Sequence, residues 1–464
     1  MNATANQHAA ESSKNASEII DGISRGPKGV LTRQELIWLA LGQVIGAGVI
    51  ALIGPSINAT GTSVWLAYVV SILFGVLIVF PFYVMSGTIR LSGGVYSSVY
   101  EIVGKRAGGI YLIGSIPAMV LLASYPIAIA TYIKAIIPGV NSLVISFLAL
   151  TLFYVINMMG AKFMAKIQTY ISYCLMLGLL AFIIFGLPKI NWAQISFSSP
   201  NFITHGTGGF FKAVFILIFS THSYYYVIGY SNNARNSRKD CPFAMRIAIP
   251  IILILYGGCG MVAAGVLPID EVAGKPLTYV AKEALPTVIF WIFYLGGAMG
   301  ALLTSLNSSF GFYANMFAGG AEDGWLPEIF ARKNKHGAYY FVLTLGYVIG
   351  LLPIIFRFPV EAVTSNMMFV NALLMCLAYI AAWKLPSKYP ELWNNSLTKM
   401  PVGVFHVIMV FSFLMEAATV VYSAMSSNIF ALVVSILIMI ISVFYAGYRL
   451  KAGKVKSKAS IWFD

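Results

Sequence analysis

Charged residues are scarce in this chain of 464 amino acids. Asp, Glu, Lys and Arg together make up 10% of it, whereas 59% of the residues are hydrophobic. This balance excludes an ordinary soluble domain, which needs a charged surface. Repeated apolar runs of about 20 residues match the hydrocarbon thickness of a bilayer, so we expect an integral membrane protein.

Cysteine and histidine are also rare. The four cysteines have no metal-ligand spacing, so neither a disulfide framework nor a zinc site is expected. The five histidines and sixteen acidic residues are too dispersed to suggest a nucleophile–base arrangement, and no phosphate-binding loop occurs. The chain is therefore not expected to be an enzyme, and no organic cofactor is expected.

The first 30 residues lack the basic start and apolar stretch of a signal peptide, so we interpret residues 1–32 as a disordered cytoplasmic tail. The net charge of +14 is not gathered in one patch, which argues against a nucleic-acid partner. Basic residues instead recur in short clusters between apolar runs, and membrane lipid is the expected surrounding.

Twelve apolar runs are predicted to span the membrane. Their approximate bounds are 34–59, 64–89, 106–137, 141–159, 163–187, 209–230, 246–267, 287–318, 338–356, 365–384, 402–424 and 428–449. With both termini inside, 24 of the 30 Lys and Arg fall on the cytoplasmic side, which is the bias expected of a protein in the cell membrane. The predicted organisation is a ten-helix transport core over 33–384, peripheral helices 11 and 12 over 385–450, and a cytoplasmic tail over 451–464.

The first span contains Gly46 and Gly48 at its centre. Two glycines weaken a helix where lipid offers the backbone no other partner. One interpretation is a helix broken near the bilayer midplane, whose ends hold a solute and its ions. The other is close packing, since Gly42 and Gly46 form a small-xxx-small face.

The sixth span carries four consecutive polar residues, Ser220 to Ser223, near its middle. Such a run is costly in a membrane unless it faces a cavity or forms internal hydrogen bonds. An inverted repeat of five plus five helices would make the first and sixth spans equivalent. That correspondence points to a transport site between them.

Six short motifs resemble the amino acid–polyamine–organocation superfamily of permeases. In order they are Gln43 to Ile50, Leu91 to Tyr96, Asn157 to Gln168, Asp240 to Pro242, Lys275 to Leu277, and Asp323 to Pro327. The resemblance covers roughly residues 31–450. It implies an all-α, leucine-transporter-like fold with broken helices 1 and 6, and a substrate bound where they unwind.

The chain departs from the superfamily pattern at four positions. Asn232-Asn233 stands where many members carry an acid, Asn315 where an arginine is common, Leu175 where some relatives carry a lysine, and Ser223 where a glycine is usual. The chain is therefore similar to a divergent member, and no single subfamily defines its substrate.

A zwitterionic amino acid would find its partners in the two breaks. The N–H groups of Ala47 and Gly48 would hold the carboxylate, and carbonyls of the two breaks would accept from the ammonium group. The full set of candidate substrate-binding residues is Val44, Ile45, Gly46, Ala47, Gly48, Phe219, Ser220, Thr221, His222, Ser223 and Tyr224.

Other polar residues of the spans have open roles. His222 is either a substrate donor that titrates near neutral pH or a neutral side chain bonded to a neighbouring helix. Thr304, Ser305 and Ser308 either help to bind a sodium ion or bond to their own helix. Glu416, in the middle of the eleventh span, must be protonated, paired or at an oligomer interface, and a structural or interface role is favoured.

The predicted function is secondary active transport of a small, neutral amino acid or close analogue by alternating access, coupled to sodium or to a proton. Sodium is favoured, because Leu175 stands where a lysine could have replaced the ion. A polyamine is disfavoured because a dication would need buried carboxylates. The alternatives are an amino acid exchanger, a proton-coupled permease for another small organic solute, and a solute sensor that does not transport. The sequence does not predict an oligomeric state.

Overall fold

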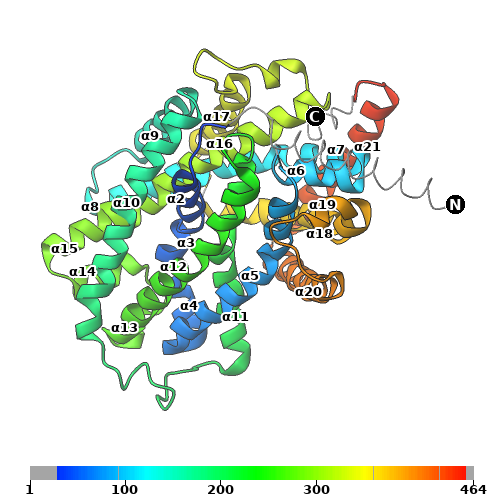
Figure 1. Cartoon of the computed structure of the whole chain (residues 1–464). Coiled ribbons are helices and arrows are strands. Elements are labelled where there is room, and N and C mark those ends of the chain that lie inside the picture. Colours follow the sequence, from blue (N-terminus) through cyan, green and yellow to red (C-terminus); the bar gives the residue numbers. More distant parts are fainter. Residues whose placement is uncertain (1–28, 92, 359, 428, 456–464) are drawn as a thin grey trace.

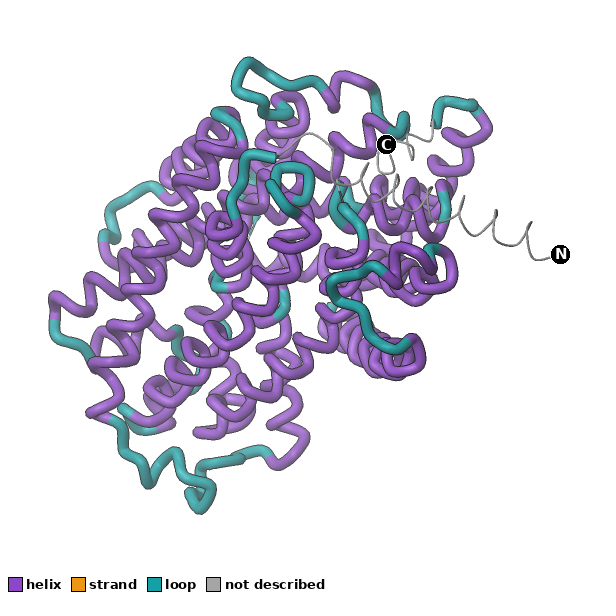
Figure 2. Tube along the Cα trace, viewed as in Figure 1, coloured by secondary structure: helices purple, strands orange, loops and turns teal. Residues whose placement is uncertain are grey.

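The computed structural model describes residues 29–91, 93–358, 360–427 and 429–455, and these form helices joined by loops (Figures 1 and 2). Within these ranges there is no strand, only an isolated parallel bridge between Leu31 and Ala234. Ten helical segments within the described ranges are long and apolar enough to cross a membrane. The predicted N-terminal tail lies mostly outside the described residues, as does the end of the C-terminal tail.

The first predicted span forms three consecutive helices. α2 (Arg33–Val44) starts at a capping box in which Thr32 and Glu35 satisfy each other's backbone N–H groups. The helix stops at Ile45, and the extended backbone of Gly46 leads into α3 (Ala47–Ala51) and then α4 (Ile53–Thr60). The interruption therefore lies where the two glycines predict it.

The sixth predicted span is interrupted in a different way. α11 (Gly206–Thr221) ends at His222, and the chain continues as the 3-10 helix η5 (Ser223–Tyr230). The polar run therefore marks a change from α-helix to the tighter 3-10 geometry, which shifts the register of backbone hydrogen bonds.

The other predicted spans correspond to further helices. Those formed by one helix are α5 (Val64–Thr88), α9 (Ser142–Met158), α10 (Ala161–Gly186), α12 (Ser237–Gly265), α17 (Tyr340–Ile355), α18 (Val360–Lys388), α20 (Val402–Ser426) and α21 (Ile429–Lys451). The third span is divided into α7 (Lys105–Gly114), the 3-10 helix η3 (Ile116–Ala123) and α8 (Ser124–Ile136). The eighth is α15 (Thr287–Ile292), the π-helix η6 (Phe293–Met299) and α16 (Gly300–Glu322).

Short helices make up most of the connections. They are η1 (Gly61–Ser63), α6 (Val95–Ser98), the π-helix η2 (Val99–Val103), η4 (Leu187–Lys189), α13 (Ile269–Val272), α14 (Leu277–Ala284), η7 (Glu328–Ala331) and α19 (Pro390–Asn394). α9 and α17 are apolar but shorter than the ten candidate spans. The count of twelve spans, the inverted repeat and the division into core and peripheral helices stay predictions.

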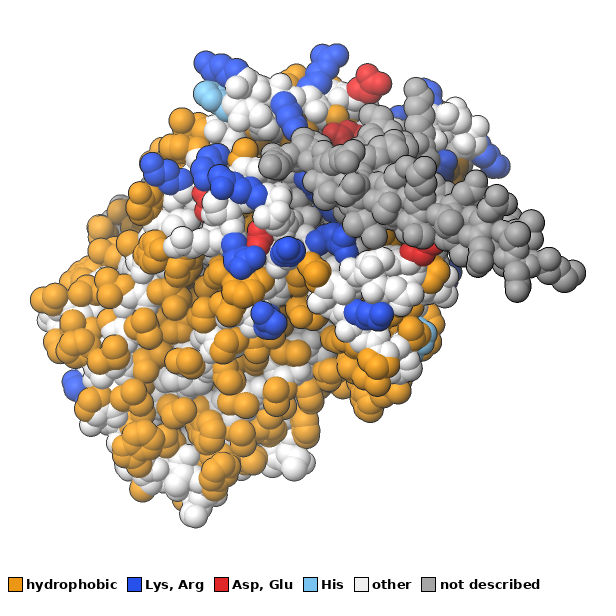
Figure 3. Space-filling view, viewed as in Figure 1, with side chains coloured by type: hydrophobic (Ala, Val, Ile, Leu, Met, Phe, Trp, Pro, Cys, Tyr) orange, Lys and Arg blue, Asp and Glu red, His pale blue; other side chains and the backbone are white. Residues whose placement is uncertain are grey.

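The surface has the distribution expected of a protein in a bilayer. In Figure 3 hydrophobic side chains cover much of the visible face, and most of the visible Lys and Arg residues gather towards one end. α16 lies in the interior, where nearly all of its side chains are buried. The predicted class, an all-α integral membrane protein, is confirmed.

Candidate functional site

The two interrupted segments contact each other inside the protein. Gly48, in α3, packs so closely on Ser220, near the end of α11, that a Cβ at Gly48 would overlap the Ser220 side chain. Gly46 faces α16, and a Cβ there would lie 2.7 Å from Ser305 Oγ. Both glycines are therefore needed for close approach between helices. The same approach places the non-helical backbone of the first break beside the second break.

Tyr256 of α12 joins the carbonyls of the two breaks. Its hydroxyl donates to Val44 O at 2.7 Å and lies 3.2 Å from Ser220 O. The N–H of Gly46 also donates to Val44 O, at 2.9 Å. The side chain of Tyr256 is fully buried, so a single phenol proton serves two acceptors that the helix interruptions have released.

Sequence reasoning missed Tyr256. It lies 36 residues beyond Ser220, in a span whose apolar pattern gives no sign of a site. The available signal was weak: a tyrosine in a membrane span needs a hydrogen-bond partner for its hydroxyl, and released carbonyls are the strongest acceptors nearby.

The predicted ion-binding hydroxyls lie along the last turn of α2. Ser305 donates to Gly42 O at 3.0 Å, and Ser308 donates to the Gln43 side-chain oxygen. Thr304 instead bonds within α16, to backbone carbonyls one turn earlier. Two of the three hydroxyls therefore reach the first interrupted span, and the third bonds to its own helix.

A polar network extends behind these hydroxyls. The amide of Asn307, in α16, donates to Gln168 of α10 at 2.8 Å and accepts from Asn157 of α9 at 3.1 Å. Gln168 in turn donates to Trp38 O in α2 at 3.3 Å. Asn157 and Gln168 belong to one of the sequence motifs, and their role here is to join four helices through satisfied buried amides.

The polar side chains of the second break form hydrogen bonds mainly with neighbouring residues of the chain. Thr221 pairs with Ser71 of α5 at 3.0 Å, and a His222 ring nitrogen lies 2.6 Å from Ile218 O within α11. Tyr224 is buried with no partner for its hydroxyl among the described residues. The side chains of Ala47 and Phe219 lie outside the description. How the predicted substrate-binding residues act stays a prediction.

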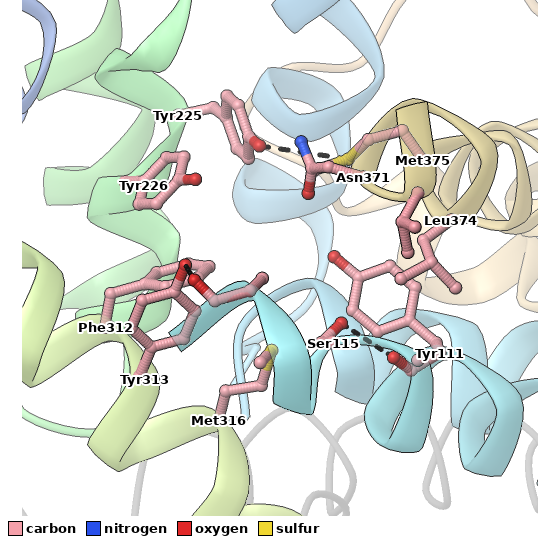
Figure 4. Close-up of a pocket in the computed structure, with 13 residues that line it drawn as sticks. Tyr111, Ser115, Tyr225, Tyr226, Phe312, Tyr313, Met316, Asn371, Leu374 and Met375 are labelled. Carbon is pink, nitrogen blue, oxygen red and sulfur yellow. Dashed lines mark hydrogen bonds between the residues drawn. The ribbon is translucent and has the colours of Figure 1, made fainter. Parts of the chain in front are cut away.

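A small cavity lies next to the second break, between η5, α7, η3, α16 and α18 (Figure 4). Tyrosines dominate its lining, which contains no charged side chain. It has room for about one water molecule. The lining residues are Tyr111, Gly114, Ser115, Ala118, Tyr225, Tyr226, Phe312, Tyr313, Met316, Val370, Asn371, Leu374 and Met375.

The break residues named from the sequence do not line this cavity, although η5 connects the two. Tyr224 directly follows the polar run and does not line the cavity, whereas the next two residues, Tyr225 and Tyr226, both line it. Figure 4 shows the Tyr225 hydroxyl directed towards Asn371 and Met375 of α18, with the Met375 sulfur at 3.9 Å. The cavity therefore adds side chains to a site that the sequence describes mainly by its backbone.

Two further motifs pair away from the breaks. The Tyr96 hydroxyl, in α6, donates to Asp323 Oδ2 at 2.8 Å. Burial, together with the Asp323 carboxylate, raises the pKa of Tyr96 well above its ordinary value, so this tyrosine remains a hydrogen-bond donor. A Cβ at Gly109 would overlap the Trp325 ring. Tyr96 thus attaches α6, and Gly109 attaches α7, to the residues at and just after the end of α16.

Ion pairs fix the start of α2. Arg33 Nε lies 2.7 Å from Asp240 Oδ1 at the start of α12, and Lys162 Nζ lies 2.8 Å from Glu35 Oε1 at the start of α10. Arg33 also lies over the Phe243 ring at 4.7 Å. The half of the first span that precedes the break is thus attached to two other helices at its first turn.

A multi-pass helical membrane protein in which two interrupted helices meet, with released carbonyls and small residues at the contact, has the architecture of a membrane transporter. The family model described as "Amino acid permease" matches residues 31–444, which is most of the chain. The chain belongs to the amino acid permease family, and it is an amino acid transporter. The resemblance to the amino acid–polyamine–organocation superfamily is confirmed.

Curated relatives match over most of their length. An uncharacterized protein of Methanocaldococcus jannaschii is 26% identical over 352 residues, covering 72% of this chain and 78% of the relative. The branched-chain amino acid permease BcaP of Bacillus subtilis is 22% identical over 351 residues, covering 68% and 73%. The D-serine/D-alanine/glycine transporter of Escherichia coli K12 is 23% identical over 409 residues, covering 80% and 84%. Identities this low fit a divergent member.

Proposed function

We propose that this chain is a secondary active transporter of a small, neutral amino acid or close analogue, working by alternating access in the cell membrane with both termini in the cytoplasm. The observation that carries the proposal is the contact between the two breaks, where Tyr256 bonds to carbonyls of both. Two relatives named as transporters of branched-chain amino acids or of D-serine, D-alanine and glycine support this class of solute.

The site favours a solute without net charge. No Asp, Glu, Lys or Arg lines the tyrosine cavity, so a cationic or anionic side chain would have no counter-charge there. A zwitterion needs only backbone groups: N–H groups at Ala47 and Gly48 for the carboxylate, and carbonyls at Val44 and Ser220 for the ammonium. The ammonium would donate to these two carbonyls beside the Tyr256 hydroxyl, which keeps them oriented.

Two coupling ions fit the proposal. Sodium takes hard oxygen ligands, and Thr304, Ser305 and Ser308 would supply hydroxyl oxygens beside the carbonyls of α2. A proton needs only one titratable group in contact with the transport path. The alternatives are obligatory exchange of two amino acids and solute sensing without transport. No specific contact among the residues that the structure describes favours either of them.

The test is uptake of labelled amino acids into proteoliposomes, with sodium and pH gradients applied separately. We expect saturable uptake of at least one neutral amino acid, and its dependence on internal unlabelled solute distinguishes net transport from exchange. No solute-dependent flux across a broad panel of amino acids would overturn the proposal.

A matched pair of glycine variants tests the site itself. In Gly48→Ala the added methyl group collides with Ser220, and overpacking of about 1–3 kcal/mol should reduce uptake roughly tenfold or more. Gly257→Ala is the control, because a Cβ at Gly257 meets no atom within 4 Å. Normal uptake by Gly48→Ala would mean that the two breaks do not have to approach each other.

A further inference from the structure

Glu416 lies in the middle of α20 and has no part in the transport steps described above. α20 buries a single stripe of side chains, and its other positions are mostly exposed and apolar. The stripe consists of Phe405, Met409, Ser412, Glu416 and Ser423, spaced as on one face of a helix. Glu416 is 4% exposed, so its carboxyl belongs to the interior rather than to the lipid-facing surface.

Among the residues that the structure describes, no Lys or Arg pairs with Glu416. α20 packs against α18 and α5. The titratable side chains within electrostatic range of the carboxyl are Cys376 and Tyr379 of α18 and Tyr225 of η5. α5 contains no charged residue, and on α20 itself His406 lies ten positions away, stacked on Trp383 of α18.

No hydrogen bond or ion pair reaches the Glu416 carboxyl from the part of the chain that the structure describes. An ionised carboxylate at this position would lose most of its hydration with no cation among the described residues to compensate. A buried carboxyl in a membrane span therefore holds a proton, unless a change of structure brings water or a cation to it. Glu416 is thus a group whose charge depends on the conformation around it.

Helix α18 lies between the tyrosine-lined cavity and α20, the helix that carries Glu416. On α18, Asn371 and Met375 line the cavity, whereas Cys376 and Tyr379 lie within electrostatic range of Glu416. Tyr225 lines the cavity and lies within electrostatic range of the carboxyl. A movement of α18 or η5 that enlarges the cavity for a solute therefore also changes the surroundings of Glu416.

We propose that Glu416 is the proton-binding site of a proton-coupled transport cycle. The carboxylate takes up one proton on a carboxyl oxygen when water reaches the contact between α18 and α20. The neutral acid persists while that contact is closed, and the same oxygen releases the proton on the other side of the cycle. The inference rests on the proposed function and selects the proton from its two coupling ions.

The experiment uses full-length protein in proteoliposomes loaded with a pH-sensitive dye, and a solute that the uptake panel has shown to be transported. An inward pH gradient of about one unit supplies roughly a tenfold driving force. For the wild type we expect faster uptake under this gradient and acidification of the lumen when solute is added. For Glu416→Gln we expect both effects to be lost, while exchange of labelled for unlabelled solute at equal pH continues.

Two further variants make the result specific. Glu328→Gln removes an exposed acid outside the predicted spans and should behave as wild type. Glu416→Asp keeps a carboxyl and should retain solute-dependent acidification at a reduced rate, which also tests the proposal if the glutamine variant fails to fold. Absence of solute-dependent acidification in the wild type overturns the proposal, as does unchanged acidification in Glu416→Gln. Absence of any solute flux would instead overturn the proposed function.

Discussion

A tyrosine hydroxyl and two glycines determine how the two breaks meet. The glycines allow the close approach, and Tyr256 supplies a hydrogen-bond donor to carbonyls that no longer have a helical partner. The sequence predicted the glycines, because Gly is the residue that interrupts a helix and admits a neighbouring backbone. It did not predict Tyr256, because nothing in a local pattern indicates which distant helix supplies a donor.

Removing the Tyr256 hydroxyl should weaken solute binding. In Tyr256→Phe the carbonyls of Val44 and Ser220 lose a shared donor, at a cost of about 1–3 kcal/mol for a buried unsatisfied group. The orientation of both carbonyls is then less well defined, so we expect KM for uptake to rise roughly tenfold. KM is measured in proteoliposomes at a matched amount of reconstituted protein.

Tyr294→Phe is the control for this variant. The Tyr294 hydroxyl also donates to a backbone carbonyl, Tyr132 O at 2.6 Å, but away from both breaks. KM should stay within experimental error of the wild-type value. An equal rise of KM in both variants would show that loss of any buried tyrosine hydrogen bond accounts for the effect.

The helices themselves followed from hydropathy and length, with three differences of detail. The third and eighth predicted spans contain 3-10 or π-helical segments, and the second break is a 3-10 helix. In these segments the spacing between backbone donor and acceptor differs by one residue from that of an α-helix, while the apolar content is unchanged. A periodicity argument therefore cannot detect them.

The attachment of α2 to its neighbours is an element-scale property that can be tested. Lys162→Gln removes the ion pair with Glu35, and more than half of the lysine side chain is exposed, so the loss is about 1 kcal/mol or less. Hydrogen–deuterium exchange at the start of α2 should speed up by roughly fivefold or less. High salt should bring the wild type close to the variant, because ions screen an exposed pair.

Lys166→Gln removes an equivalent charge one helical turn further along α10. Among the described residues Lys166 makes no ion pair, so its removal should leave exchange in α2 unchanged. A similar acceleration in both variants would assign the effect to net charge at this surface rather than to the contact with Glu35.

At the scale of the whole molecule, the class of protein and a complete topology were predicted from the sequence, and the class is confirmed. The predicted orientation of the chain in the membrane rests on the distribution of Lys and Arg, with 24 on the predicted cytoplasmic side and 6 on the other. The arrangement of helices around the site depends on long-range packing, which the order of apolar runs does not contain. For this reason the cavity lining could not be derived, although several of its residues lie beside the predicted break.

The predicted topology is tested with single cysteines in a background that lacks the four native ones. Ser198→Cys lies between α10 and α11, and Lys335→Cys lies between α16 and α17, with both positions exposed. An impermeant maleimide added to intact cells should label Ser198→Cys but not Lys335→Cys. After permeabilisation both should react, and the reverse pattern in intact cells would invert the topology.

The parallel bridge at Leu31 links the chain before α2 to the loop that follows η5. Leu31 N–H donates to Asn233 O at 2.7 Å, and Arg235 N–H donates to Leu31 O at 3.0 Å. A displacement of Leu31 is therefore transmitted to both interrupted segments together.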